Sequence, residues 1–152
     1  MKILILLTLC LFSVGVMHAQ KNDYLKVRSK VYSPTCGRQT TEDIQAAIQR
    51  LHALDTVGMK NLYAYYEDLG ASHWMLMNRD PVHLDSVIMY NLKALTHKPN
   101  APKALWNMAF AYKLRDDCMK VIEYINLYKQ HTSTKEWVDD TQINNLLADC
   151  KR

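Results

Sequence analysis

Histidines, cysteines and acidic pairs are the residues of this 152-residue chain whose side chains could perform chemistry. Metal sites and nucleophilic centres hold such groups at characteristic spacings, as in C-x-x-C, H-E-x-x-H and G-x-S-x-G. The sequence contains none of these motifs and no glycine-rich phosphate loop. His73, His83 and His97 lack metal-ligand spacing to one another, so each is interpreted as a solvated or half-buried helix residue. We therefore expect no metal site and no cofactor.

Two further features resemble catalytic groups but have structural explanations. Asp116 and Asp117 form a pair of carboxylates, yet a turn followed by a helix N-terminus accounts for both. Cys36, in the loop Pro-Thr-Cys-Gly, would be a thiol nucleophile if a distant histidine approached it. No family signature surrounds it, which favours a structural cysteine. A small hydrolase or thiol-dependent enzyme without a recognisable motif is the alternative to the non-catalytic protein that we expect.

The elements that must position these residues are helices. Apolar residues recur at helical spacing, and glycine and proline are scarce, with four of each. Thr41 before Glu42 and Asp43 is typical of a helix start, and Gly70 is expected to end the second helix. The predicted helices are 41–55, 57–69, 82–98, 102–114, 117–131 and 134–149, with a short apolar piece at 71–81. Helical spacing assigns four residues of the second helix to its core side and flanks: Leu62, Tyr65, Tyr66 and Leu69. The predicted fold class is all-α.

Two segments of the chain repeat one another thirty-four positions apart. Val87, Ile88, Tyr90 and His97 of the first recur as Val121, Ile122, Tyr124 and His131 of the second. A period of this size is typical of stacked helical repeats, in which equivalent helices recur. An ordinary helical bundle with a chance echo is the alternative.

Residues 102–135 resemble a tetratricopeptide repeat, a helix–turn–helix unit of this length. The large, small and aromatic positions of its motif are matched by Leu105, Met108, Ala109, Tyr112, Val121 and Ile125. One period earlier, matches are found at Val87, Ala94 and Pro99. Departures from the motif are Asn91, Tyr128 and Ser133, and the register is lost upstream of Val82. The resemblance, which covers roughly 82–135, implies a short right-handed array of helical hairpins capped by the helices at 41–55, 57–69 and 134–149.

The resemblance also implies a binding face, because the first helices of successive repeats in this family line a concave groove for a peptide or a partner helix. Lys103, Asn107, Phe110 and Lys113 stand at the corresponding outward positions. An amide such as Asn107 both donates and accepts, as binding of a peptide main chain requires. The two lysines favour an acidic ligand or a C-terminal carboxylate. A polar helix face with one exposed aromatic is the alternative interpretation.

The first nineteen residues have the layout of a secretory signal peptide. Lys2 precedes an apolar stretch, Ile3 to Val16, and a cut after Ala19 would follow. This stretch is too short to span a membrane comfortably and no second one follows, so we expect no transmembrane segment after signal removal. The domains expected are a signal peptide (1–19), a basic arm (20–40) and a helical domain (41–152). We expect an exported protein, periplasmic or secreted.

The basic arm and the cysteines are interpreted in the light of that export. The chain carries a formal net charge of +4, and in an exported protein a basic arm favours an anionic surface or solubility over nucleic acid. Cys36, Cys118 and Cys150 remain after signal removal. An oxidising compartment favours one disulfide and one thiol. A bridge between Cys36 and Cys150 would tie down both ends of the chain; three unpaired thiols are the alternative.

Overall fold

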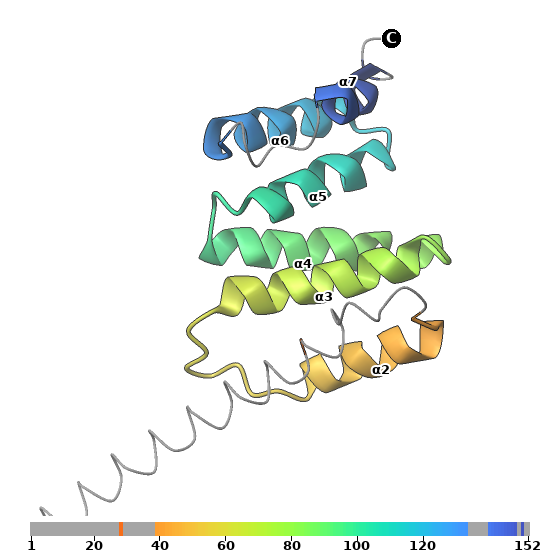
Figure 1. The fold of residues 1–152 in the computed structure, drawn as a ribbon, viewed down its shortest axis with the longest axis vertical. Coiled ribbons are helices and arrows are strands. Elements are labelled where there is room, and N and C mark those ends of the chain that lie inside the picture. Colours follow the sequence, from red (N-terminus) through yellow and green to blue (C-terminus); the bar gives the residue numbers. More distant parts are fainter. Residues whose placement is uncertain (1–27, 29–38, 134–139, 149, 151–152) are drawn as a thin grey trace, which may run out of the picture. The chain divides into compact units, whose positions relative to one another are not determined.

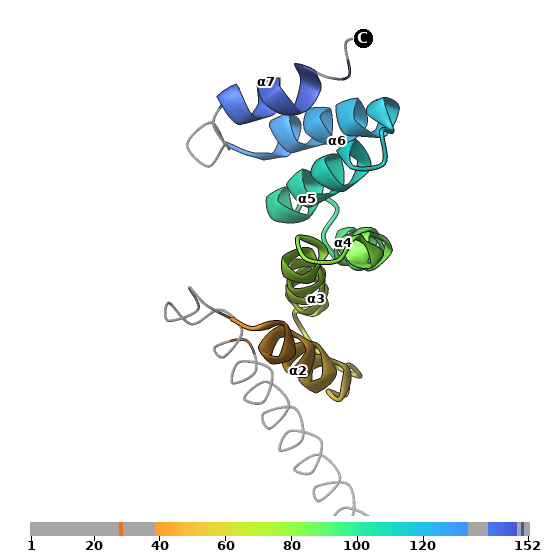
Figure 2. The same ribbon diagram turned by 90° about the vertical axis from the view of Figure 1, so that its right-hand side faces the viewer.

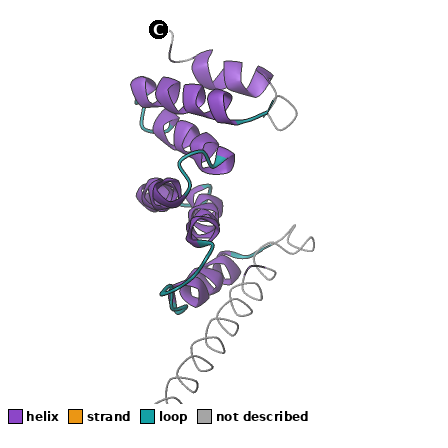
Figure 3. Ribbon diagram, turned by 90° about the vertical axis from the view of Figure 1, so that its left-hand side faces the viewer, coloured by secondary structure: helices purple, strands orange, loops and turns teal. Residues whose placement is uncertain are grey.

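The computed structural model describes residue 28, residues 39–133, residues 140–148 and residue 150. The elements in this part of the chain are α2 (Thr41–His52), α3 (Leu62–Met77), the 3-10 segment η1 (Pro81–His83), α4 (Leu84–His97), α5 (Pro102–Lys113), α6 (Cys118–His131) and α7 (Asp140–Ala148) (Figure 1). Among these described residues there is no strand, so the predicted all-α class is confirmed (Figure 3).

The chain divides into two compact units, residues 1–62 and residues 63–152. The predicted helical domain at 41–152 spans this boundary. The predicted signal peptide, 1–19, and the predicted basic arm, 20–40, lie outside the described residues apart from positions 28, 39 and 40.

Helix α2 of the first unit begins with a reciprocal cap. The Asp43 backbone N–H donates to Thr40 Oγ1, and the Thr40 backbone N–H donates to the Asp43 carboxylate. This pair satisfies two of the backbone donors that a helix start leaves open. The helix buries one stripe of apolar side chains, Ile44, Ala47, Ile48 and Leu51.

Helix α3 continues through Gly70, where the sequence predicts a helix end. That prediction is wrong, and residues 71–77 of the predicted apolar piece at 71–81 form the second half of the helix. A Cβ atom on Gly70 would lie 2.7 Å from Asn91 Nδ2 of α4. Glycine therefore serves here to let α4 approach, a tertiary requirement that outweighs its helix penalty of about 1 kcal/mol.

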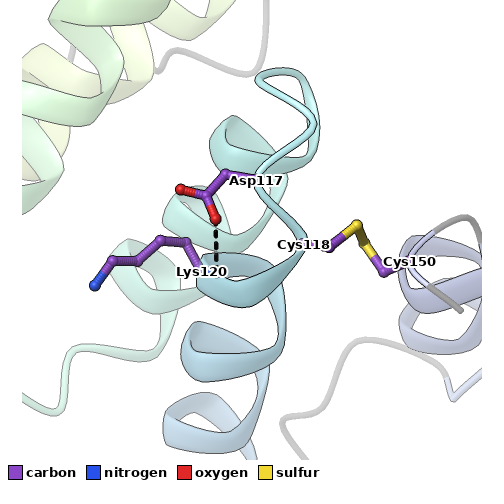
Figure 4. Close-up of a disulfide and its surroundings, with 4 residues drawn as sticks. All are labelled: Asp117, Cys118, Lys120 and Cys150. Carbon is purple, nitrogen blue, oxygen red and sulfur yellow. Dashed lines mark hydrogen bonds between the residues drawn. A yellow bond between two sulfur atoms is a disulfide. The ribbon is translucent and has the colours of Figure 1, made fainter.

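The connections that follow α3 and α5 are built on capping aspartates. Asp80 accepts a hydrogen bond from the Val82 N–H and opens η1, so the helix predicted from 82 begins as a 3-10 turn. Asp116 adopts a left-handed conformation with φ 56°, and Asp117 caps α6 by accepting from the Lys120 N–H (Figure 4). The interpretation of Asp116 and Asp117 as a turn and a helix start is confirmed.

The interior of the 63–152 unit is formed by α4, α5, α6 and α7 together with the end of α3. In this order each helix from α4 onward packs on the next, as Figure 2 shows. Helix α5 thus has a neighbour on two sides, and its five buried residues include Leu105, Met108 and Ala109. The other core residues are Met77, Val87, Ile88, Ala111, Val121, Tyr124, Ile125, Tyr128, Ile143 and Leu146.

A disulfide joins Cys118, the first residue of α6, to Cys150, which follows α7 (Figure 4). The proposed pairing of Cys36 with Cys150 is therefore wrong, and Cys36 lies outside the described residues. The reason is packing: α7 buries Ile143 and Leu146 in the core next to α6, which brings the two Cα atoms to 5.2 Å. The bridge fastens the last described helix to the body of the unit.

Candidate functional site

Four residues predicted to face a partner, Lys103, Asn107, Phe110 and Lys113, lie on α5 and are called the α5 face. Lys103 is exposed and the other three are half-buried. Phe110 packs edge-to-face on Trp74 of α3, with ring centroids 4.9 Å apart and an interplanar angle of 67°. The aromatic of the α5 face is therefore one member of a two-helix aromatic pair.

Asn107 is held by a chain of amides that runs from α5 into α4. Its Nδ2 donates to Asn91 Oδ1 at 3.2 Å, and Asn91 Nδ2 donates to the Val87 carbonyl at 2.8 Å. Asn91 is fully buried, so this chain satisfies a polar group that would be costly to bury alone. Asn107 is thereby fixed in one orientation, and its Oδ1 acceptor takes no part in the chain.

Trp74 is the residue of this face that the sequence analysis missed. Trp74 falls in the stretch 71–81, which is not predicted to be helical, so it is not placed on a face of any predicted helix. Trp74 lies in the second half of α3, and its contact with Phe110 brings it to the α5 face. Trp106, one residue before Asn107, points elsewhere and packs on Tyr128 at 5.7 Å.

The charge of the α5 face is positive. Helix α5 has the sequence PKALWNMAFAYK, which contains two lysines and no acidic residue. Lys103 and Lys113 stand ten residues apart, about 15 Å along a helix that rises 1.5 Å per residue. The lysines therefore lie at the two ends of a face whose middle is an amide and an aromatic ring.

A second group of rings lies between α3 and α4. Tyr66 is stacked with Tyr90 at 6.5 Å and with His97 at 5.6 Å, and His73 is stacked with Tyr90 at 5.3 Å. Lys93 Nζ lies 5.6 Å from the Tyr66 ring centroid and 5.5 Å from that of Tyr90, within cation–π range. The predicted placement of this tyrosine group on the core side and flanks of a helix is confirmed, since Tyr65 and Leu69 are buried and Leu62 and Tyr66 half-buried.

Two of the three histidines considered in the sequence come together. His73 Nδ1 of α3 lies 3.1 Å from His83 Nδ1 at the end of η1. His97 does not join them, because it stacks on Tyr66. Histidines ten residues apart match no metal-binding motif. The two rings meet because α3 continues past Gly70 and the chain then turns back through η1.

A hollow of about 140 Å³ lies between α6 and α7 beside the disulfide. Its lining is mainly apolar: Ile122, Ile125, Asn126, Lys129, Leu147 and Cys150. Cys150 is in the disulfide, so Lys129 is the only titratable side chain of this lining. The hollow does not gather the acid, base and nucleophile that a catalytic centre needs.

No family model, no curated protein and no solved structure matches the chain. Within the described residues no cluster of three or more histidines, cysteines or acidic residues is placed to hold a metal ion. No helix of the same residues has the length and apolar character that crossing a membrane requires.

Proposed function

We propose that this protein is exported and binds a protein or peptide partner, without catalysis, through the α5 face. In this proposal the 63–152 unit is a short right-handed array of tetratricopeptide-like hairpins, with α3 paired to α4, α5 paired to α6, and α7 as a cap. Three observations support it: the echo thirty-four positions apart, the packing of each helix from α4 onward on the next, and the full burial of Ala109 at a tight position.

The contact of Trp74 with Phe110 is the observation that carries the proposal. Both rings are half-buried, so each keeps surface for a ligand while the other holds it in place. Aromatic side chains dominate the energetics of small interfaces, above all when they are rigid. A partner that covers this pair would bury apolar area on rings that lose little freedom on binding.

The chemistry around the rings favours an acidic peptide segment. Lys103 and Lys113 flank the pair on a helix without acidic residues. Asn107, oriented by Asn91, presents an acceptor oxygen that suits a main-chain N–H of an extended segment. Fixing this amide in advance lowers the entropy that binding would otherwise cost.

The export part of the proposal has a direct test. Mature protein isolated from the native host should begin near Gln20, after removal of residues 1–19. N-terminal sequencing reports that residue. Cytoplasmic protein that retains Met1 would contradict export.

The binding part is tested with matched variants used as bait. The parent chain, Asn107→Ala, Phe110→Ala and Glu123→Ala are immobilised and exposed to the periplasmic fraction and to the culture medium of the native host. Glu123 is exposed on α6 and serves as the control. We expect the first two substitutions to weaken partner binding by about 1–3 kcal/mol, since each removes a contact at a desolvated site.

Quantitative mass spectrometry of the retained proteins separates the outcomes. We expect a partner to be retained by the parent and by Glu123→Ala, and to be depleted on the Asn107→Ala and Phe110→Ala baits. All three variants must show the helical circular dichroism of the parent. Retention that is equal on all four folded baits would contradict binding through the α5 face.

A further inference from the structure

The fold brings His73 and His83 together from two elements of the chain. His73 lies in the second half of α3 and stacks on the Tyr90 ring, with an interplanar angle of 18°. His83 ends η1, where its N–H donates to the Asp80 carbonyl at 3.3 Å. The Asp80 N–H in turn donates to the Leu76 carbonyl of α3 at 2.8 Å. The backbone thus turns back toward α3, and the His83 ring contacts the His73 ring.

We propose that His73 and His83 together form a binding site for a divalent transition-metal ion of the class that prefers imidazole ligands. The two Nδ1 atoms are 3.1 Å apart. A metal ion at a typical bond length of 2.0–2.1 Å from each nitrogen would subtend an angle of roughly 100° between them. This angle suits two adjacent positions of a tetrahedral or a square-planar ion.

Metal binding would replace the hydrogen bond that now joins the two rings. In that bond one Nδ1 carries the hydrogen and the other accepts it, so the donor ring must change tautomer and carry its hydrogen on Nε2. Both rings must also rotate until their lone pairs converge on the ion instead of lying along the line between them. Both histidines are half-buried, so part of each residue is exposed to solvent.

The ligand set decides which ions this site takes. Two neutral imidazoles suit Cu²⁺, Ni²⁺ and Zn²⁺, with Cu²⁺ bound most tightly, whereas Mg²⁺ and Ca²⁺ require oxygen ligands. Since no third histidine, cysteine or acidic residue joins the pair within the described part of the chain, water completes the coordination. The site therefore leaves open positions on the metal. The inference does not depend on the proposed peptide-binding function.

The test uses the full mature chain without an affinity tag, titrated with Zn²⁺, Cu²⁺ and Mg²⁺ by isothermal calorimetry. The variants are His73→Gln and His83→Gln, which keep a polar side chain, and the control is His97→Gln, a histidine of the neighbouring ring group. We expect one Zn²⁺ or Cu²⁺ per chain, no Mg²⁺, and a loss of at least about tenfold in affinity in either pair variant, since even substitutions outside the ligand set cost 10–100-fold. His97→Gln should bind like the parent.

A spectroscopic measurement keeps the test decisive if one variant folds poorly. Electron paramagnetic resonance of the Cu²⁺ complex should show coupling to two imidazole nitrogens in the parent and to one in His83→Gln, whose substitution lies outside the α-helices. Three results would overturn the proposal: Zn²⁺ and Cu²⁺ dissociation constants weaker than about 1 mM, equal binding by parent and both pair variants, or an equal loss in His97→Gln.

Discussion

Tyr90 of α4 and Tyr124 of α6 have matching surroundings thirty-four positions apart. Each is 8% exposed, and each stacks on a tyrosine of the helix before its own, Tyr90 on Tyr66 and Tyr124 on Tyr112. Burial, followed by repulsion from the neighbouring phenols, raises the pKa of both side chains above the ordinary value of 10.0. The echo in the sequence thus corresponds to two similarly buried rings.

The raised pKa values predict that the protein loses stability at alkaline pH. The folded state favours the neutral phenol of each tyrosine. The stability that this gives is fully present below about pH 10 and is lost as pH rises through the raised folded pKa. Urea unfolding at about pH 9 and pH 11 should show a lower free energy of unfolding at the higher pH. Tyr124→Phe should reduce the difference in unfolding free energy between the two pH values. An unchanged difference would show that Tyr124 does not cause the pH dependence.

Gly70→Ala should destabilise the protein, although alanine is the better helix former. The added methyl would lie 2.7 Å from Asn91 Nδ2, and Asn91 is fully buried and hydrogen-bonded to Val87 and Asn107. We expect a loss of about 1–3 kcal/mol, as for other overpacked cores. The double variant Gly70→Ala, Asn91→Ala should lose less than the sum of the single losses. Additive losses would show that the Gly70–Asn91 approach is not the cause.

Ala109→Trp should also be strongly destabilising. Ala109 is completely buried in the core formed by α4, α5, α6 and α7, so an indole there must displace its neighbours. The expected loss is about 1–3 kcal/mol or more. Ala148→Trp is the control, because Ala148 is exposed at the end of α7. Thermal unfolding of both variants gives the comparison, and a parental melting temperature for Ala109→Trp would contradict a tight helix contact at this residue.

Much of the fold is predictable from local sequence, and the failures arise where tertiary contacts decide. The stripes of apolar residues place α4, α5 and α6 to within a few residues, because burial repeats every three to four positions. The predicted helix end at Gly70 is wrong because the rule that glycine ends a helix takes no account of the close approach of Asn91. The two connections also differ in length: six residues, 78–83, join α3 to α4, whereas four, 114–117, join α5 to α6.

The candidate sites show the same division. Four residues of the α5 face are found on one helix because their spacing is helical, but Trp74 and the partnership of His73 with His83 depend on how separate helices meet. The disulfide depends on α7 packing beside α6, and no spacing rule selects Cys118 over Cys36.

Loss of the Cys118–Cys150 bridge should destabilise the 63–152 unit. The bridge spans 32 positions, and closing a loop of that length in the unfolded chain is worth about 3–4 kcal/mol in the chain-entropy description. Cys118→Ala should show this loss in urea unfolding under oxidising conditions, whereas Cys36→Ala should not. Non-reducing peptide mapping of the parent should recover a peptide that contains both Cys118 and Cys150. A peptide that joins Cys36 to Cys150 would contradict the structure.

The lysines of the α5 face should contribute to partner binding in a manner that depends on salt. Lys103 is exposed, and an exposed charge is screened over about 10 Å at 0.1 M ionic strength. Once a partner has been identified, Lys103→Ala should weaken its binding at low salt by about 0.2–1 kcal/mol, the range of exposed ion pairs. The loss should shrink as salt rises, while the loss in Phe110→Ala should persist because it reflects buried apolar area.

Lys129→Ala supplies the matched control for Lys103→Ala. Lys129 is an exposed lysine of α6, so its removal changes the net charge of the protein by the same amount without altering the α5 face. Fluorescence titrations of the parent and the three variants at two salt concentrations separate a local contact from a general effect of charge. Equal losses in Lys103→Ala and Lys129→Ala would assign the salt dependence to the overall charge. A Phe110→Ala variant that bound like the parent while its circular dichroism was unchanged would remove the α5 face as the binding site.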